Sequence, residues 1–530
     1  MLMVDTDVVI VGAGFAGLYQ LHRVRGLGLR ARVFEAGSGV GGTWYWNRYP
    51  GARCDVESLE YSYSFSPELE QEWEWTERYP GQPEILRYAE HVADRFDLRR
   101  DITFDTRVTH ATWCDDHWEI RTDGGEELTA TYCVFATGCL SMPKEPDLPG
   151  VGTFAGPTYS TSRWPHEGVD FTGRRVVVIG TGSSAVQSIP VIATQAAQLT
   201  VYQRTANYVV PARNAPMDPA AQAARKADYP RFRKEARESL GGLLGTPSEV
   251  SALSVTPEER TAAFDKAWAT GGLGSFRQTF GDLALTLEAN DTVADYIRGR
   301  IREIVADPET ADALGPKDHP FGTKRPCLDT GYFETYNLPH VRLVDLRKTP
   351  IVAIEPAGVR TTEELVEVDD LVLATGFDAM TGALLAVDIR GRDGVRLRDA
   401  WADGPRTYLG LGVAGFPNLF TVTGPGSPSV LSNMLVSIEQ HVDWITDCLA
   451  ALAGRTIEAE EQAQEQWTAH VAEVGAQTLM HRADSWYLGA NVPGKPRVLL
   501  PYVGGVGTYR TICDGVAARG YEGFRLTETA

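Results

Sequence analysis

Short apolar runs that end in glycine recur along the first 210 residues of the chain. Val8–Val11 and Val176–Ile179 are unbroken aliphatic runs, the pattern of strands buried on both faces of a parallel sheet. Each run is followed by a glycine-rich turn and then by a stretch that can open a helix. This strand, turn and helix order occurs twice, so the sequence predicts an α/β fold with two Rossmann-like dinucleotide-binding domains.

The two glycine turns predict two different cofactors. The strand after the first turn ends at Glu35, where a carboxylate can accept from a ribose 2′-hydroxyl, as in FAD. The strand after the second ends at Arg204, where a guanidinium suits the 2′-phosphate of NADPH, although a solvated cation at a strand end would look the same. The predicted FAD residues here are Gly12, Gly14, Ala16, Gly17 and Glu35, and the predicted NADPH residues are Gly180, Thr181, Gly182, Ser183, Ser184, Gln187, Arg204 and Thr205.

A repeated signal marks where the chain leaves and re-enters the first domain. Residues 133–138 read CVFATG and residues 371–376 read LVLATG, and between them lies a charged, alanine-rich region of helical period. The prediction is an FAD-binding domain from residues 1–141 and 375–530, an NADPH-binding domain from residues 150–214 and 322–374, and a helical insertion at residues 215–321.

Composition narrows the class of protein. A net charge of −20 disfavours nucleic acid and acidic membranes as partners, and no apolar run is long enough to span a bilayer. The seven cysteines contain no CxxC pair, so we expect neither a disulfide framework, nor a metal site, nor the dithiol of a disulfide reductase. We expect a cytoplasmic enzyme, and a monomer.

The segment 41–55, GGTWYWNRYPGARCD, has more glycines and aromatic residues than a plain connection needs. An aromatic-rich core loop is one interpretation. The segment also resembles the flavin-side motif of the type I Baeyer–Villiger monooxygenases, in which GGxW, a YPG turn and a terminal aspartate recur. The resemblance implies FAD contacts at Thr43, Trp44, Tyr45, Trp46, Asp55, Tyr61 and Val108, and NADP contacts at Arg53 and Asp55.

A second family fingerprint is present with one departure. The family has Phe, Gly, His, Trp and then Pro or Asp at fixed spacing, and this chain has Phe154, Gly156, Ser160, Trp164 and Pro165. Serine therefore stands where the family has histidine, and it cannot carry charge near neutral pH. This puts catalytic coupling in doubt. His166 could compensate, although an exposed turn histidine is the plainer interpretation.

A third motif, GTKRP at residues 322–326, carries paired cations. A surface salt-bridge pair is the alternative. The resemblance implies that Arg325 lies over the flavin, oriented by Asp55, where its fixed charge stabilises a flavin peroxide and later an oxyanion. It also implies that Lys324 reaches the NADPH 2′-phosphate, and that NADP⁺ is retained during turnover by Arg204, Lys324 and Trp486.

The glycine-rich stretch 424–435 implies, by the same resemblance, that Met434 meets the flavin and that Met434 and Leu435 line the substrate pocket. Core packing is the alternative for both. Across its length the chain looks most similar to the phenylacetone and steroid monooxygenase branch, which favours a bulky or aryl ketone.

The leading hypothesis is an FAD-dependent enzyme that uses NADPH and O₂ to convert a ketone to an ester or lactone. Three alternatives stay open: a flavin monooxygenase for sulfur or nitrogen, a dinucleotide-binding redox sensor without oxygenation, and an NADPH-to-flavin reductase that serves a partner protein.

Overall fold

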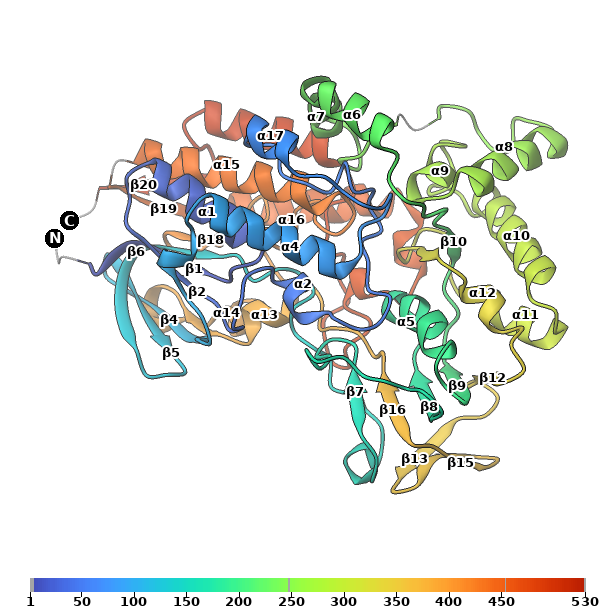
Figure 1. Ribbon diagram of the computed structural model, residues 1–530. Helices are drawn as coiled ribbons and strands as arrows, with labels where there is room; N and C mark the ends of the chain where they lie inside the picture. The colour runs from blue at the N-terminus through green and yellow to red at the C-terminus, as the bar shows by residue number, and fades with distance from the viewer. Residues whose placement is uncertain (1–3, 246–247, 453, 529–530) are drawn as a thin grey trace.

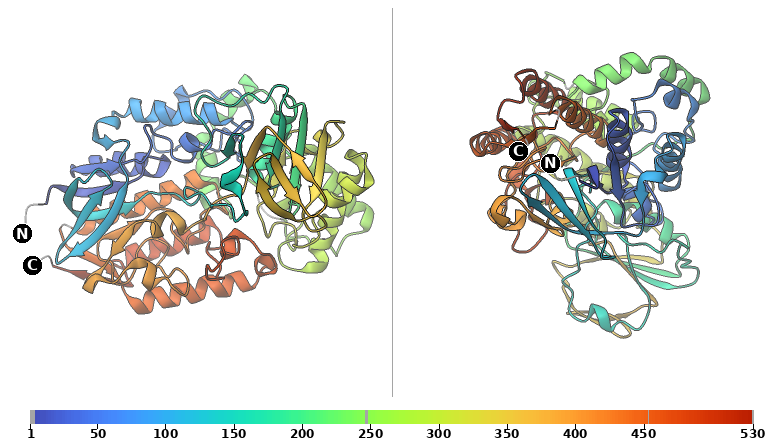
Figure 2. Two further views of the ribbon diagram at one scale, coloured as in Figure 1. Left: turned by 90° about the horizontal axis from the view of Figure 1, so that it is seen from below. Right: turned by 90° about the vertical axis from the view of Figure 1, so that its left-hand side faces the viewer.

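The computed structural model describes residues 4–245, 248–452 and 454–528. Its strands form two main sheets, each built around parallel strands. The two sheets lie side by side, with helices packed on their faces (Figures 1 and 2). The predicted α/β fold with two dinucleotide-binding sheets is confirmed. The predicted ranges also include residues 1–3, 246–247, 453 and 529–530, which lie outside the described residues.

The first sheet has the order β17-β4-β5-β6-β1-β2-β3, with β18 beside β6. β1 pairs in parallel with both β2 and β6. Alternate residues of β1 face opposite sides: Val8 and Ile10 pack under the helices α1 (Phe15–Gly26) and α15 (Met434–Leu452), and Val9 and Val11 pack into the core on the other face. The strands are β1 (Thr6–Val11), β2 (Ala31–Phe34), β3 (Ile102–Thr103), β4 (Val108–Cys114), β5 (His117–Thr122), β6 (Glu127–Phe135), β17 (Asp388–Arg390) and β18 (Leu419–Thr421).

Helices from both ends of the chain pack on the two faces of this sheet, and blue and orange helices lie together over one face in Figure 1. They are α1 (Phe15–Gly26), α2 (Thr43–Trp46), α3 (Pro67–Glu72), α4 (Gln82–Arg95), α13 (Gly382–Leu385), α14 (Leu397–Ala400), α15 (Met434–Leu452), α16 (Glu461–Ala476) and α17 (Val506–Ala518). Short 3₁₀ turns are η1 (Arg99–Asp101), η3 (Arg392–Gly394), η4 (Leu479–Arg482) and η5 (Trp486–Leu488), and β19 (Thr456–Ala459) pairs with β20 (Phe524–Thr527).

The second sheet has the order β12-β9-β8-β16-β7 and all of its pairings are parallel. α5 (Ser183–Ala193) covers one face, on the side of Val176 and Val178. The strands are β7 (Thr158–Ser160), β8 (Arg175–Ile179), β9 (Gln198–Gln203), β12 (Val341–Asp345) and β16 (Asp370–Leu373), and the sheet of β13 (Ile351–Glu355), β14 (Gly358–Thr361) and β15 (Leu365–Glu367) lies next to η2 (Val151–Thr153).

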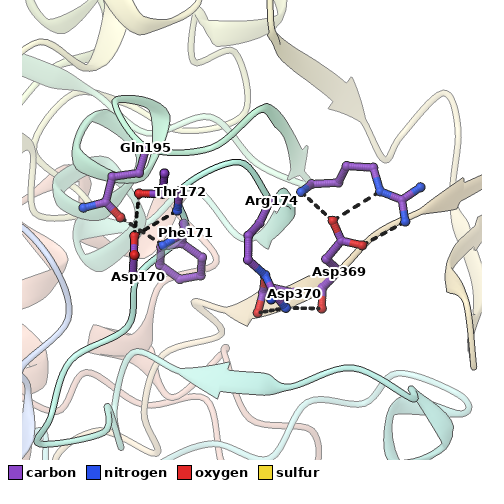
Figure 3. Close-up of polar contacts among 8 residues, drawn as sticks. Asp170, Phe171, Thr172, Arg174, Gln195, Asp369 and Asp370 are labelled. Carbon is purple, nitrogen blue, oxygen red and sulfur yellow. Dashed lines mark hydrogen bonds and ion pairs between the residues drawn. The ribbon is translucent and has the colours of Figure 1, made fainter.

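Two arginine–aspartate pairs hold β16 beside β8. Arg175 Nη2 lies 2.9 Å from Asp369 Oδ1, and the adjacent Arg174 donates to Asp370, with Nη2 3.1 Å from Oδ1 (Figure 3). The Arg175 side chain and backbone hold the pKa of Asp369 down at about 2. The parallel ladder between β16 and β8 continues to Leu373, and β16 then runs directly into Thr375 and Gly376, so this pairing fixes the second strand-to-turn signal in place.

The chain moves between the sheets where the repeated signal predicts it. It leaves the first sheet after β6, and it returns from the second sheet after β16. The exact division into domains stays a prediction.

The helical insertion is drawn in green in Figure 1, where its later helices lie beside the second sheet and its first two helices lie against the helices of the first sheet. It consists of α6 (Pro219–Ala227), α7 (Tyr229–Glu238), α8 (Pro257–Thr270), α9 (Leu273–Arg277), α10 (Leu287–Ile304) and α11 (Pro308–Leu314), and α12 (Tyr332–Thr335) follows it. The chain enters the insertion after β10 (Val209–Pro211) and leaves it at β11 (Cys327–Asp329). β10 and β11 pair with each other in parallel. This pairing fixes the returning segment that carries Lys324 and Arg325. Over the described residues, no helix is both long and apolar enough to cross a bilayer.

Candidate functional site

A cavity of about 1270 Å³ is lined by both glycine turns and by the segments that connect the two sheets. From the predicted flavin side it is lined by Gly12, Gly14, Ala16, Glu35, Thr43, Trp44, Trp46, Asp55, Tyr61, Val108 and Met434. From the predicted nicotinamide side it is lined by Arg53, Gly180, Thr181, Gly182, Ser183, Ser184, Gln187, Arg204, Thr205, Lys324 and Trp486. The fold thus gathers most of the predicted site residues around one space.

The glycines of the two turns have steric reasons to be glycine. Gly12 has φ +105°, and a Cβ there would lie 2.7 Å from the carbonyl oxygen of Ala136. Gly180 repeats this arrangement in the second turn, with φ +117° and a Cβ position 2.4 Å from the carbonyl oxygen of Ala374. Both positions therefore exclude side chains, and they let the turns lie against the two ATG segments.

Two helices open into the cavity with their first amides uncapped. α1 begins after Gly14 and α5 after Gly182, and in the described structure no side chain caps either N-terminus. A Cβ at Gly182 would meet no atom within 4 Å, so that approach is open. Uncapped amides at the positive end of a helix suit a pyrophosphate. The residues present therefore fit two dinucleotides.

Glu35 is buried beneath the first turn. Its two carboxylate oxygens accept from the backbone N–H of Ala13 and of Gly37, both at 2.7 Å. Burial raises the pKa of Glu35, and these hydrogen bonds oppose that rise. The carboxylate thus holds the turn in shape, and its contact with a ribose stays a prediction. Arg107, which sequence reasoning missed, lines the same end of the cavity.

Arg325 and Asp55 form a two-point pair in the cavity wall although 270 positions separate them. Arg325 Nη2 donates to Asp55 Oδ1 at 2.8 Å, and Nε donates to Oδ2. A third donor, Nη1, lies 2.8 Å from the carbonyl oxygen of Val430. Burial lowers the pKa of Arg325, but the Asp55 charge and its hydrogen bonds raise it further, so the guanidinium is permanently charged. These three hydrogen bonds fix the orientation of the guanidinium plane.

Gln187 joins α5 to the loop that carries the YPG turn. Its Oε1 accepts from the Tyr49 hydroxyl at 2.8 Å, and its Nε2 donates to the carbonyl of Arg53 at 3.1 Å. Arg53 also donates to Glu77 Oε2 at 2.9 Å. These contacts connect elements of the two sheets in the cavity wall.

Three predicted site residues do not line the cavity. Gly17 packs α1 against β1, with a Cβ position only 1.8 Å from the carbonyl oxygen of Gly12. Tyr45 turns away, and its hydroxyl accepts from the N–H of Ser38 at 3.0 Å. Leu435 is 1% exposed in the core, because the face of α15 that reaches the cavity carries Met434 and Ile438, four residues apart.

The second fingerprint also lies outside the cavity wall and builds the second sheet instead. Trp164 packs on Phe171 in the core, and a Cβ at Gly156 would lie 2.5 Å from the carbonyl oxygen of Asp369. Phe154 packs against the buried cluster on the other face of this sheet, the face of Val177 and Ile179. Pro165 and Ser160 are half-buried.

Ser160 has an indirect connection to the cavity. Its hydroxyl lies 2.8 Å from that of Ser162, and Ser162 lines the cavity. The His166 ring lies 5.0 Å from that of Tyr45, outside the cavity. His166 thus packs on Tyr45, and the part of the chain that the structure describes shows no hydrogen bond between it and Ser160 or Ser162. Across the described residues, no cluster of metal-ligating side chains is present.

Comparison with known proteins agrees with the geometry. A family model described as pyridine nucleotide-disulphide oxidoreductase matches residues 9–217, but the described cysteines form no disulfide pair. A Baeyer–Villiger monooxygenase of Pseudooceanicola batsensis is 42% identical and covers 99% of this chain and 97% of its own length. A phenazine N-monooxygenase of Lysobacter antibioticus is 43% identical, over 98% of this chain and 97% of its own length.

Among solved structures, an oxidised steroid monooxygenase bound to NADP superposes with a TM-score of 0.94 at 53% identity, over 99% of each chain. Whole-length identity at this level, together with the cavity that the two dinucleotide turns share, shows that the chain belongs to the type I Baeyer–Villiger monooxygenases, which are NADPH-dependent FAD enzymes.

Proposed function

We propose that this chain binds FAD at the first glycine turn and NADPH at the second, and oxidises a bulky or aryl ketone to an ester or lactone with O₂. The observation that carries the proposal is the three-point fixation of Arg325 by Asp55 and Val430 in the cavity that both turns share. The preference for a bulky ketone is supported by the 53% identity to a steroid monooxygenase.

The bound flavin would supply the redox chemistry with NADPH and O₂. Arg325 would stabilise negative charge that develops on oxygen during ketone oxidation, because its donors are already fixed and need no reorganisation. Asp55 keeps the guanidinium in that orientation. Arg325 cannot act as a general acid, since its pKa lies far above neutral pH.

Arg204, Lys324 and Trp486 would hold NADP⁺ during turnover and exclude water from the flavin side of the cavity. All three line the cavity, and Trp486 packs against Tyr487 with ring centroids 4.2 Å apart. A monomeric, cytoplasmic enzyme remains our prediction, and light scattering after size-exclusion chromatography tests the first part.

A panel of ketones and thioethers tests the proposal. NADPH consumption should rise with ketones, and ester or lactone should form in step with it, as followed by mass spectrometry. Bulky and aryl ketones should outperform small cyclic ones. Hydrogen peroxide as the sole oxygen product with every ketone would refute ketone oxidation.

The second candidate is nitrogen or sulfur oxygenation. It is favoured by the similarity to a phenazine N-monooxygenase and by serine at position 160. Turnover of thioethers or heteroaromatic amines without turnover of any ketone would make it the better description.

Substituting Arg204 should separate the two nicotinamide coenzymes. We expect Arg204→Ala to lower kcat/KM for NADPH by about 10-fold to 100-fold, the effect of losing one charge-assisted hydrogen bond, and to change NADH little. Steady-state kinetics with both coenzymes measures this, and an equal loss with both would contradict the assignment of Arg204 to the 2′-phosphate.

Restoring the family histidine tests whether serine limits coupling. In Ser160→His the imidazole would stand beside Ser162 at the cavity wall, and we expect more ester and less hydrogen peroxide per NADPH. Product and peroxide are quantified in the same reaction. Unchanged or lower coupling would mean that the Ser160–Ser162 pair is an adaptation of this enzyme.

A further inference from the structure

The lining of the cavity includes three cations, Lys144, Arg204 and Lys324, and Arg204 is the residue at which the 2′-phosphate of NADPH is expected. In residues 4–245, 248–452 and 454–528, no carboxylate lies within ion-pairing distance of their side-chain nitrogens. Arg204 and Lys324 stand in recognisable motifs, whereas Lys144 lies in a proline-rich connection that gives no sequence signal.

The carboxylates near these cations have other partners or lie further away. Asp318 accepts from His319 at 2.7 Å and pairs with Arg347 at 2.7 Å, and Asp484 pairs with Arg497. Asp147 lines the same cavity and raises the pKa of Lys144, but burial and Arg204 lower it more, so the net shift is downward. Asp318 and Asp484 raise the pKa of Lys324 but already pair with other cations, so the protein offsets the positive charge of the group only in part.

The three cations affect one another. Burial is the main cause that lowers the pKa of Lys144, and repulsion by Arg204 adds to it. Burial is also the main cause that lowers the pKa of Lys324; Asp318 opposes this shift, and repulsion by Arg204 adds to it. Like charges gathered in a half-buried space are unfavourable unless an anion joins them. A phosphate dianion has the charge and the acceptor oxygens that three such donors need.

The position of Lys144 is fixed by the backbone. Its N–H donates to the carbonyl of Gly376 at 3.1 Å, and its carbonyl accepts from the Thr375 hydroxyl at 3.4 Å. The N–H of Asp378 donates to the carbonyl of Met142 at 2.9 Å. The two connections between the sheets therefore run side by side, and Lys144 projects from this paired segment.

We propose that Lys144 is a third ligand of the NADPH 2′-phosphate, and that it makes the connection between the two sheets part of coenzyme recognition. The proposal rests on NADPH binding at the second glycine turn. It assigns to this enzyme a phosphate site with three cations, one of which is carried by the segment that joins the FAD and NADPH regions.

The test measures, by calorimetry, the affinity of the FAD-loaded enzyme for two adenine nucleotides. 2′,5′-ADP carries the 2′-phosphate and 5′-AMP lacks it. We expect Lys144→Met to weaken 2′,5′-ADP about tenfold, the effect of one charge-assisted hydrogen bond, and to leave 5′-AMP unchanged. Lys144→Arg should retain most of the affinity. Lys348→Met is the matched control, because Lys348 pairs with Glu309 outside the cavity, and it should change neither nucleotide.

The outcomes separate this inference from the proposed function. If the unaltered enzyme prefers 2′,5′-ADP and Lys144→Met keeps that preference, the role of Lys144 is refuted while NADPH binding stands. An equal loss of both nucleotides in Lys144→Met, with normal FAD content, would also refute it. If the unaltered enzyme does not distinguish the two nucleotides, both the NADPH assignment and the Lys144 inference fail.

Discussion

Arg325→Ala should abolish ester formation while the flavin remains reducible by NADPH. Removing a fixed donor to developing negative charge typically costs about 100-fold to 1000-fold in turnover, and Arg325 presents such donors on a plane held by Asp55 and Val430. Flavin reduction uses hydride from NADPH and does not require that charge. Anaerobic stopped-flow absorbance measures reduction, and mass spectrometry measures product.

The pairing of Arg325 with Asp55 requires a control for the carboxylate that Arg325→Ala leaves behind. The Asp55 side chain is 22% exposed, so water can reach it, but an unpaired charge still perturbs the cavity. The double variant Arg325→Ala/Asp55→Ala removes both charges. Product should stay absent in it, because the donor is still missing. Recovery of product in the double variant would show that the arginine only neutralises Asp55.

Gly17→Ala should cost the enzyme its FAD and much of its stability. A Cβ at this position would lie 1.8 Å from the carbonyl oxygen of Gly12, so α1 would have to move away from β1 and from the turn that holds the pyrophosphate. Overpacking of this kind typically costs about 1–3 kcal/mol and occasionally more, and here the obstacle is backbone that cannot rotate away. Flavin content of the purified protein and thermal unfolding measure the two effects.

Gly26 provides a matched control in the same helix. It is the last residue of α1, and a Cβ there would meet no atom within 4 Å. Gly26→Ala should therefore be neutral, or stabilising by up to about 1 kcal/mol, with normal flavin content. Equal losses in both variants would mean that helix α1 tolerates no change, and that the close approach at Gly17 is not the cause.

The fold was predictable because its strongest signals are local. An unbroken aliphatic run followed by glycines, as at Val8–Val11 and again at Val176–Ile179, leaves few alternatives to a buried strand and a phosphate turn. The repeated ATG segments likewise marked both passages between the sheets, which the structure places after β6 and after β16.

The details of the cavity wall were less predictable, because they depend on which face of an element points inward. Met434 and Leu435 are neighbours in sequence, but successive residues of a helix point about 100° apart, so one lines the cavity and the other lies in the core. Tyr45 likewise points away from the cavity, and its hydroxyl accepts a hydrogen bond from the N–H of Ser38 instead.

Contacts between residues far apart in the sequence could be predicted only where both residues belong to recognised motifs. The Asp55–Arg325 pair spans 270 positions, and only the resemblance of both motifs to one family suggested it. Neither the carbonyl of Val430 nor the side chain of Lys144 was predicted as a site group, so their places in the cavity wall became visible only in three dimensions.

A crystal structure of the enzyme with FAD and NADP⁺ bound tests the central claim most directly. The claim is that Arg325, held by Asp55, acts on the flavin. The guanidinium should lie within contact distance of the isoalloxazine ring, about 4 Å, with the two-point pair to Asp55 retained. An Arg325 that stays out of contact with the ring in every captured state would contradict it.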